Sequence, residues 1–168
     1  MPERIQIVDE HDQLIGTSTR QEAWAKGSYH RLVQIVLRDE EDNFLLQKRS
    51  PNRPLYPGCW TNAASGHVDE GESYEAAAPR ELIEEIGLKV PLTFKGKIVV
   101  KKVLGSKRIN QFHAVFEGRI AHTTQFTLQP EEVSEVRWFA PEELRAGIAK
   151  NPEAFTPAVV KAIEEFYQ

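Results

Sequence analysis

Cysteine is almost missing from this chain of 168 residues, which carries a single one, at position 59. A disulfide within the chain is therefore impossible, and a reducing compartment suits this count, so we expect a cytoplasmic protein. Long apolar runs are missing too, since no stretch approaches the roughly 20 apolar residues of a membrane span. The first residues also lack the apolar segment of a signal peptide. The sequence therefore predicts no membrane partner.

Positive charge is in short supply, because 21 Lys and Arg face 25 Asp and Glu and leave a net charge of −4. Proteins that bind nucleic-acid polymers are usually basic, so we expect no polymer partner. A nucleotide ligand is still compatible with this charge, since a bound metal ion reverses the sign locally. The length and a hydrophobic content of 40% fit one globular domain over residues 1–168.

The most informative stretch covers residues 66–88, GHVDEGESYEAAAPRELIEEIGL. Its pattern predicts a loop followed by one helix, which begins at Glu72 or Ser73 and ends at Gly87. The side chains that we expect on the buried side of this helix are Ala76, Ala77, Ile83 and Ile86.

Three glutamates, Glu81, Glu84 and Glu85, are spaced i, i+3 and i+4, which places them on one helix face. Their negative charges repel each other unless a positive charge lies among them. A hard divalent cation, Mg²⁺ or Mn²⁺, is the natural counterion for such a set of carboxylates. Pro79 removes a backbone donor inside the helix, so we expect a bend there or an effective start close to Arg80.

The whole stretch resembles the Nudix box, written G-x5-E-x7-R-E-U-x-E-E-x-G-U with U an apolar aliphatic residue. Every defined position is filled, by Gly66, Glu72, Arg80, Glu81, Leu82, Glu84, Glu85, Gly87 and Leu88. The chain is therefore identified as a member of the Nudix hydrolase superfamily. The interpretation without function is a solvated acidic helix that ends at a glycine.

This resemblance implies both a metal site and catalytic roles. The implied metal ligands are Glu81, Glu84, Glu85 and the backbone carbonyl of Gly66. Glu81 would also act as a base or orient water, and Arg80 would pair with a carboxylate of the box, Glu72, to hold the helix against the loop. A further base outside the box is common in the family, and its candidates here are Glu131, Glu132 and Glu135.

Other side chains are candidates for binding the substrate. The candidates for contact with its charge are Arg31, Arg49, Arg53 and His67, and for each of them a structural or surface role is the alternative. Tyr56, Trp60 and Phe112 could stack on a base, although aromatic side chains on strands more often belong to the core.

The rest of the pattern predicts an α+β fold. Strands are expected at residues 5–8, 14–16, 31–38, 44–49, 59–64, 93–104, 109–120 and 135–139, and further helices at 19–26, 141–149 and from 156 or 157 onwards. This order is similar to the mixed β-sheet between α-helices of Nudix proteins, in which a homodimer is common.

Several segments outside the box resemble type I isopentenyl-diphosphate isomerase and its Nudix relatives, notably residues 29–31 and 57–62. That enzyme implies a catalytic cysteine where this chain has Ser65, and a Glu-x-Glu pair near residues 110–113, which hold no carboxylate. In isomerases, residues of the Arg-Glu-x-x-Glu-Glu sequence are usually replaced, whereas all of them are present here.

We therefore expect metal-dependent hydrolysis of a diphosphate linkage in a nucleoside diphosphate derivative or related nucleotide. The alternatives are isopentenyl-diphosphate isomerisation and a Nudix module that binds a nucleotide without cleaving it. Such a module would be expected to lose glutamates of the box, and this chain has lost none.

Overall fold

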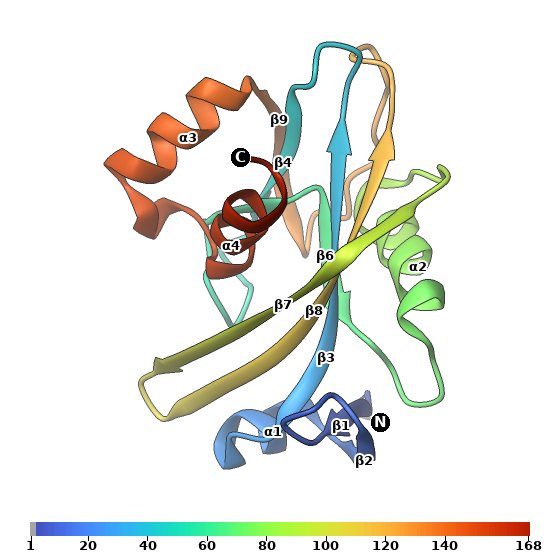
Figure 1. The fold of residues 1–168 in the computed structure, drawn as a ribbon, viewed down its shortest axis with the longest axis vertical. Helices are drawn as coiled ribbons and strands as arrows, with labels where there is room; N and C mark the ends of the chain where they lie inside the picture. The colour runs from blue at the N-terminus through green and yellow to red at the C-terminus, as the bar shows by residue number, and fades with distance from the viewer. Residues whose placement is uncertain (1–2) are drawn as a thin grey trace.

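The computed structural model describes residues 3–168, which form one mixed β-sheet with helices on both faces (Figure 1). The strands are β1 (Ile5–Val8), β2 (Leu14–Ser18), β3 (Tyr29–Arg38), β4 (Phe44–Arg49), β5 (Trp60–Asn62), β6 (Ala64–His67), β7 (Thr93–Leu104), β8 (Lys107–Arg119) and β9 (Val133–Phe139). The helices are α1 (Arg20–Lys26), α2 (Tyr74–Ile86), α3 (Pro141–Lys150) and α4 (Pro157–Phe166), with a 3₁₀ turn at Pro152–Ala154. The predicted α+β fold is confirmed.

Strand β3 is the centre of the sheet. It pairs antiparallel with β1, β4 and β6 and parallel with β8. Because successive side chains of a strand point to opposite faces, Val33, Ile35 and Leu37 pack under α2, whereas Val36 packs with α3 and α4. Figure 1 shows α2 on one side of the sheet and α3 and α4 on the other.

Helix α2 has the predicted caps. The Ser73 hydroxyl accepts a hydrogen bond from the backbone N–H of Ala76 at 3.1 Å, and Gly87 ends the helix in the left-handed conformation with φ of 73°. The helix runs without a break from Tyr74 through Pro79, so an effective start close to Arg80 is wrong. The N–H that Pro79 lacks would have bonded four residues back, near the first turn, where the helix meets solvent.

The buried side of α2 differs from the prediction. Its buried apolar side chains are Ala77, Ala78, Leu82 and Ile86. Ala76 is exposed and the side chain of Ile83 is 47% exposed, so their predicted burial is wrong. A residue two positions further along a helix is turned by about 200°. Because Glu81 points inward, Ile83 must therefore point to solvent.

The strand predicted at residues 59–64 divides into β5 and β6, and β6 continues through Gly66 and His67, which we expected in a loop. Strand β6 pairs with β3, where Gly66 lies opposite Val33. The pairing fixes the backbone at the start of the box, directly beside α2.

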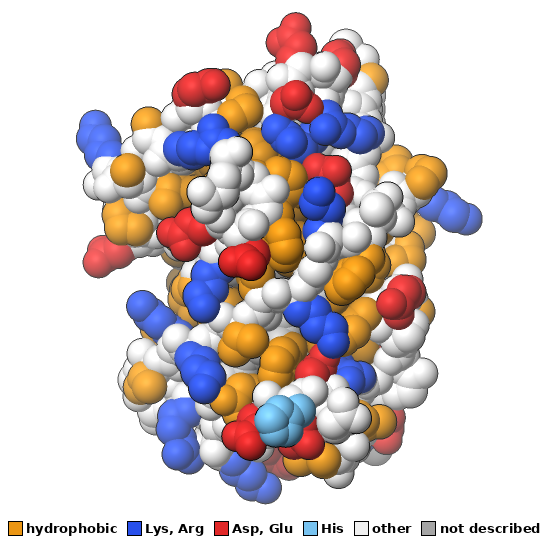
Figure 2. Space-filling view, in the orientation of Figure 1, with side chains coloured by type: hydrophobic (Ala, Val, Ile, Leu, Met, Phe, Trp, Pro, Cys, Tyr) orange, Lys and Arg blue, Asp and Glu red, His pale blue; other side chains and the backbone are white. Residues whose placement is uncertain are grey.

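Among residues 3–168, none of the helices is both long and apolar enough to cross a membrane. On the face seen in Figure 2, Lys and Arg side chains are interspersed with acidic and hydrophobic ones.

Candidate functional site

Three carboxylates converge where α2 meets the segment before β9. Glu81 and Glu85 come from α2 and Glu132 comes from the loop, and their nearest oxygens all lie within 4.8 Å of one another. Glu81 and Glu85 are buried, with 7% and 2% of their surface exposed. Ser50 anchors the loop, since its backbone N–H donates to the Glu132 carbonyl at 2.9 Å. We call these three side chains the carboxylate cluster.

Ionisation of the buried carboxyl groups in the cluster is unfavourable. Burial, only partly offset by Arg80, raises the pKa of Glu81 to about 8. Burial and the neighbouring Glu81 and Glu132 raise the pKa of Glu85 well above its usual range. Carboxylates held this close cannot all be ionised cheaply without protons or a cation among them. Oxygen ligands without sulfur or nitrogen suit a hard cation such as Mg²⁺ or Mn²⁺, so the residues present fit the implied metal.

Gly66 lies in direct contact with the cluster. A Cβ built on Gly66 would lie 2.1 Å from Cδ of Glu81, a distance at which the carboxyl group must move. Its place in β6 opposite Val33 leaves the backbone little room to retreat. The glycine is therefore required by close approach and not by an unusual backbone conformation.

We expect Gly66→Ala to lower the free energy of unfolding by about 1–3 kcal/mol, as overpacking of a tight site does. It should also weaken Mn²⁺ binding, because the displaced Glu81 carboxyl group is part of the cluster. Urea unfolding and water proton relaxation measure the two effects. The matched control is Gly16→Ala, where a Cβ meets no atom within 4 Å. Equal behaviour of the two variants would contradict the assigned role of Gly66.

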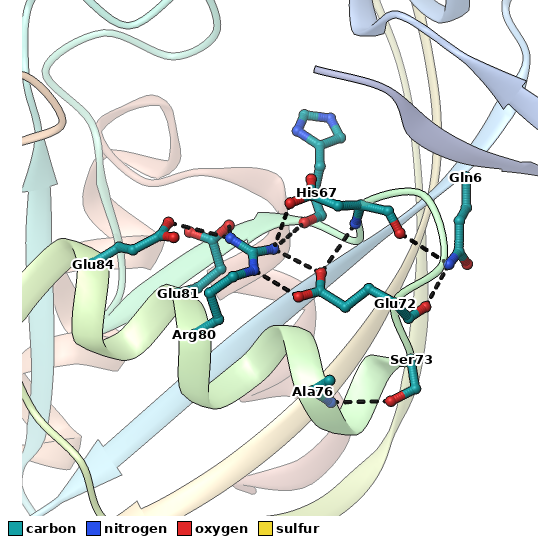
Figure 3. Close-up of polar contacts among 9 residues, drawn as sticks. Gln6, His67, Glu72, Ser73, Ala76, Arg80, Glu81 and Glu84 are labelled. Atoms are coloured by element: carbon teal, nitrogen blue, oxygen red, sulfur yellow. Dashed lines mark hydrogen bonds and ion pairs between the residues drawn. The ribbon is translucent and has the colours of Figure 1, made fainter.

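Arg80 holds the cluster against the loop of the box (Figure 3). Its Nε and Nη2 donate to the two carboxylate oxygens of Glu72 at 2.6 and 2.8 Å, which confirms the predicted pair. Its Nη2 also donates to the His67 carbonyl at 3.0 Å, and Nη1 donates to Glu81 at 2.8 Å. One guanidinium thus connects the loop, β6 and the buried glutamate.

Glu84 lies apart from the carboxylate cluster. Its side chain is 51% exposed, and Nη1 of Arg80 donates to its carboxylate at 3.2 Å. It nevertheless lines the same hollow as Glu81 and Glu132. The structure therefore brings together two of the three predicted glutamate ligands and adds Glu132, the one candidate base that reaches them. Glu135 instead lies 3.9 Å from Lys48.

A second hollow adjoins that of the carboxylates, and we call it the side cavity. The residues that line both hollows are Arg20, Arg53, Ser65, Gly66 and His67. Among the residues that line the side cavity but not the hollow of the carboxylates, Trp24, Leu55 and Tyr56 are aromatic or apolar. Arginines at a border between a carboxylate cluster and such side chains suit a ligand that is anionic at one end and organic at the other.

Three of the four predicted substrate-binding residues line the side cavity, namely Arg49, Arg53 and His67. Burial and nearby Arg53 lower the pKa of Arg49 to about 10, and Arg53 lies 3.7 Å from Glu132. Arg31 is engaged elsewhere, because its guanidinium donates to Asp12 at 2.6 Å and to Gln6 at 2.9 Å. Its predicted place at the substrate is therefore not supported.

Of the three aromatic candidates, only Tyr56 lines the side cavity. Trp60 packs edge-on against Phe139, and Phe112 packs against Tyr29. Sequence reasoning missed Trp24 and Arg20 on α1. The sequence did predict the capped helix from Thr19 to Gly27 that carries them. It did not indicate a role at the site, because an aromatic side chain on a short helix usually belongs to the core.

A series of buried hydrogen bonds includes three residues that line the side cavity, Gln34, Gln111 and His113. Gln34 Nε2 donates to Nδ1 of His113 at 2.9 Å, and His113 Nε2 donates to Gln111 Oε1 at 2.9 Å. Gln111 Nε2 donates to Nε2 of His30 at 3.2 Å, whose Nδ1 donates to the Ser28 carbonyl at 2.9 Å. An amide nitrogen can only donate, so we assign these directions and one neutral tautomer to each histidine.

The two buried histidines of this hydrogen-bonded series make the stability of the protein depend on pH. Burial lowers the pKa of His30 to about 4 and of His113 to about 3. The unfolded histidines take up protons near pH 6.5, well before the folded ones do, so stability is lost as pH falls below 6.5. At pH 5 each histidine should cost about 2 kcal/mol relative to pH 7. The raised pKa values of Glu81 and Glu85 act in the opposite direction.

A comparison of variants isolates the histidine effect. In urea unfolding between pH 7 and pH 5, we expect His113→Gln to lose about 2 kcal/mol less than the parent protein. The control is His11→Gln, because the side chain of His11 is 77% exposed and takes no part in the buried hydrogen bonds. Identical pH dependence in the parent and in His113→Gln would show that His113 is not held neutral.

The chain is similar to known proteins over most of its length. The sequence model of the NUDIX domain matches residues 28–159. The chain is 34% identical over 167 residues to a prenyl-diphosphate phosphatase of Methanosarcina mazei, covering 98% of this chain and 95% of that protein. It is 36% identical over 157 residues to isopentenyl-diphosphate Delta-isomerase 2 of Photorhabdus laumondii, covering 93% and 88%. A crystal structure from Deinococcus radiodurans superposes with a TM-score of 0.80 at 26% identity, over 99% of this chain and 100% of the other.

Proposed function

The chain belongs to the Nudix family, and from this premise we propose that it hydrolyses a diphosphate linkage of a small organic molecule with the help of a divalent cation. The carboxylate cluster at the border of the side cavity is the observation that carries this proposal. Nucleoside diphosphate derivatives are the substrates that we place first.

The proposed cation site consists of Glu81 and Glu85 with the Gly66 carbonyl, and with Glu84 and Glu132 at its edge. A cation bound there would neutralise phosphoryl oxygens and acidify water, which is the chemistry that hydrolysis of a diphosphate needs. Glu132 is then the candidate base, because its carboxylate belongs to the cluster and its side chain is 30% exposed to water. Arg80 keeps Glu81 in place through its 2.8 Å hydrogen bond.

The arginines of the border would bind the substrate's charge. Arg20 and Arg53 line both hollows, so a diphosphate lying between the cluster and the side cavity passes both guanidinium groups. A guanidinium matches the geometry of phosphoryl oxygens and stays charged at any ordinary pH. Positioning of this kind, together with charge stabilisation, is the main contribution that a protein makes to phosphoryl transfer.

Isomerisation is the weaker alternative, although relatives named as isomerases align over most of the chain. Ser65 offers no thiol, and its backbone N–H donates to Glu85 at 2.8 Å. On β8, Gln111 and His113 bond to each other and supply no carboxylate that could move a proton on carbon. A binding module without catalysis would not need two buried glutamates whose ionisation is this costly.

The test is a substrate panel with Mg²⁺, Mn²⁺ or EDTA. It contains nucleoside di- and triphosphates, nucleotide sugars, dinucleotides, and isopentenyl and dimethylallyl diphosphate, and it records phosphate release and double-bond isomerisation separately. We expect cation-dependent phosphate release from at least one compound and no isomerisation. Tight binding of several compounds without cleavage of any would support the binding module instead.

A further inference from the structure

The loop of the box, residues 68–73, is bound by Gln6 of β1 as well as by Arg80. Gln6 is 4% exposed, and its Nε2 donates to the backbone carbonyl of Asp69 at 3.0 Å and to that of Glu72. Figure 3 shows Glu72 between Gln6 and Arg80. Gln6 therefore binds the backbone of the same residue whose carboxylate accepts from Arg80.

Arg31 determines which end of the Gln6 amide faces the loop. Nη1 of Arg31 donates to Oε1 of Gln6 at 2.9 Å. Because a guanidinium has no acceptor, the amide oxygen must face Arg31, and the amide nitrogen is left for the two carbonyls of the loop. The opposite orientation would bring the amide oxygen against those carbonyl oxygens and the NH₂ group against Arg31. Arg31 thus acts on the loop through Gln6.

Asp12 holds Arg31 in place from the turn between β1 and β2. The side chain of Asp12 is 5% exposed, and its Oδ1 accepts from Nε of Arg31 at 2.6 Å while its Oδ2 accepts from Lys97 at 2.6 Å. Burial by itself would raise the pKa of Asp12, but the hydrogen bonds from its partners outweigh burial and lower that pKa. The carboxylate is therefore ionised at neutral pH. Both Asp12 and Gln6 precede residues 28–159, the region that matches the NUDIX domain.

The Asp12 carboxylate also binds the start of α2. The hydroxyl of Tyr74, the first residue of this helix, donates to Oδ2 of Asp12 at 3.0 Å. The guanidinium of Arg31 lies 5.0 Å from the centre of the Tyr74 ring. Gln6 binds the loop at residues 69 and 72, and Asp12 binds residue 74. The β1–β2 hairpin and β3 therefore hold the loop and the first turn of the helix together.

We propose that Gln6 and Arg31 are positioning residues for the carboxylate cluster. They keep Glu72 where both of its carboxylate oxygens accept from Arg80, and Arg80 in turn donates to Glu81 at 2.8 Å. Neither residue lines the hollow of the carboxylates or the side cavity, so neither contacts a substrate bound there. This inference rests on the proposed function, because it concerns the same cation site.

Gln6→Leu tests the role of the amide without changing the charge of the protein. We expect the dissociation constant for Mn²⁺, measured by water proton relaxation, to rise about tenfold, the lower end of the effect of residues that support metal ligands from outside. We expect kcat to fall by a similar factor and KM to change less than about twofold, because both hollows keep their lining. The matched control is Asn110→Leu, whose amide donates to the Gly27 carbonyl at 2.9 Å, outside the box. It should leave Mn²⁺ binding unchanged.

Arg31→Met tests whether Arg31 acts through Gln6. This substitution removes a positive charge, which by itself favours cation binding, so weaker Mn²⁺ binding cannot be an effect of charge. We expect a rise of about tenfold in the dissociation constant, and no further rise when Arg31→Met is combined with Gln6→Leu. Effects that add in the double variant would overturn the proposed path. A raised KM with parent-like Mn²⁺ binding in Arg31→Met would also overturn it and would return Arg31 to the substrate.

Hydrogen exchange separates this inference from the proposed function. In the protein without metal, Gln6→Leu should speed exchange of the Glu70 and Glu72 amides about tenfold, the effect of one to two lost hydrogen bonds, and Asn110→Leu should not. If the parent protein binds no Mn²⁺ and cleaves no diphosphate, the proposed function fails, and unchanged exchange would then overturn the inference as well. If the parent binds Mn²⁺, parent-like affinity in Gln6→Leu would overturn it even when exchange is faster. Thermal unfolding of each variant checks that it is folded.

Discussion

Glu85→Gln is expected to lower kcat for diphosphate hydrolysis by at least about a hundredfold, the scale of losing one strong electrostatic stabiliser. Glu85 is 2% exposed and lies within 4.8 Å of Glu81 and Glu132, so its charge acts directly on any cation held there. Because that charge chiefly stabilises the transition state, KM should change much less than kcat. Steady-state kinetics over a range of Mg²⁺ concentrations measures both.

The fold should survive this substitution. Oε1 of Glu85 accepts hydrogen bonds from Gln47 Nε2 at 2.9 Å and from the Ser65 N–H at 2.8 Å, and a glutamine carbonyl can accept both. The pKa of Glu85 is raised in the folded protein, so stability is lost as the pH rises above the ordinary pKa of a glutamate. At pH 8 without metal, Glu85→Gln should therefore unfold at the same temperature or higher.

The matched control for Glu85→Gln is Glu75→Gln, on the exposed first turn of the same helix. It removes the same charge from α2 but not from the cluster, so it should leave kcat unchanged. Similar losses in the two variants would mean that only the overall charge of the helix matters. Full activity of Glu85→Gln would remove Glu85 from the site altogether.

Arg80→Met should be the most destabilising of these substitutions. It deletes hydrogen bonds to three carboxylates and to the His67 carbonyl; the carboxylates are those of Glu72, Glu81 and Glu84. Removing one partner of a buried ion pair costs about 3–5 kcal/mol. Because the Arg80 side chain is 26% exposed, we expect a loss of about 2–3 kcal/mol in the free energy of unfolding.

Urea unfolding tests this loss, with Arg137→Met as the control. Arg137 pairs with Glu143 at 2.7 Å, but both side chains are about half exposed, so its removal should cost at most about 1 kcal/mol. Equal losses in the two variants would contradict the role of Arg80 as the connection between loop, strand and helix. Activity should fall in Arg80→Met as well, since Glu81 loses its anchor.

The sequence predicted the parts of the site that follow from local spacing. The turn of a helix brings Glu81 and Glu85 to one face, and the box places Arg80 within reach of Glu72, as the structure confirms. The caps at Ser73 and Gly87 follow from the same local rules.

Contacts between distant segments could not be read in this way. Glu132 reaches the cluster because Ser50 holds its loop, and nothing local distinguishes it from Glu131 or Glu135. Arg31 had equal standing with Arg53 as a candidate, but Asp12 from a distant turn binds its guanidinium. The partner of a long charged side chain depends on tertiary packing, which a single sequence does not display.

The outward turn of Ile83 has the same origin. The apolar pattern alone predicts that Ile83 is buried. A helix can turn only one face toward the sheet, however, and on α2 that face carries Glu81 and Glu85. The conflict is visible in the sequence, because the apolar residues Leu82 and Ile83 stand between the glutamates Glu81 and Glu84. Only the packing of α2 on β3 and β6 decides it.

The central claim is that water attacks phosphorus at the carboxylate cluster, and phosphorus NMR in ¹⁸O-enriched water tests it most directly. The protein is incubated with Mg²⁺ and its best substrate from the panel, and the phosphate-bearing products are followed over time. The account predicts new signals with the small isotope shift of one ¹⁸O on phosphorus, which EDTA abolishes and Glu85→Gln slows at least about a hundredfold. Products without ¹⁸O on phosphorus, or an isomerised carbon chain on an intact diphosphate, would contradict it.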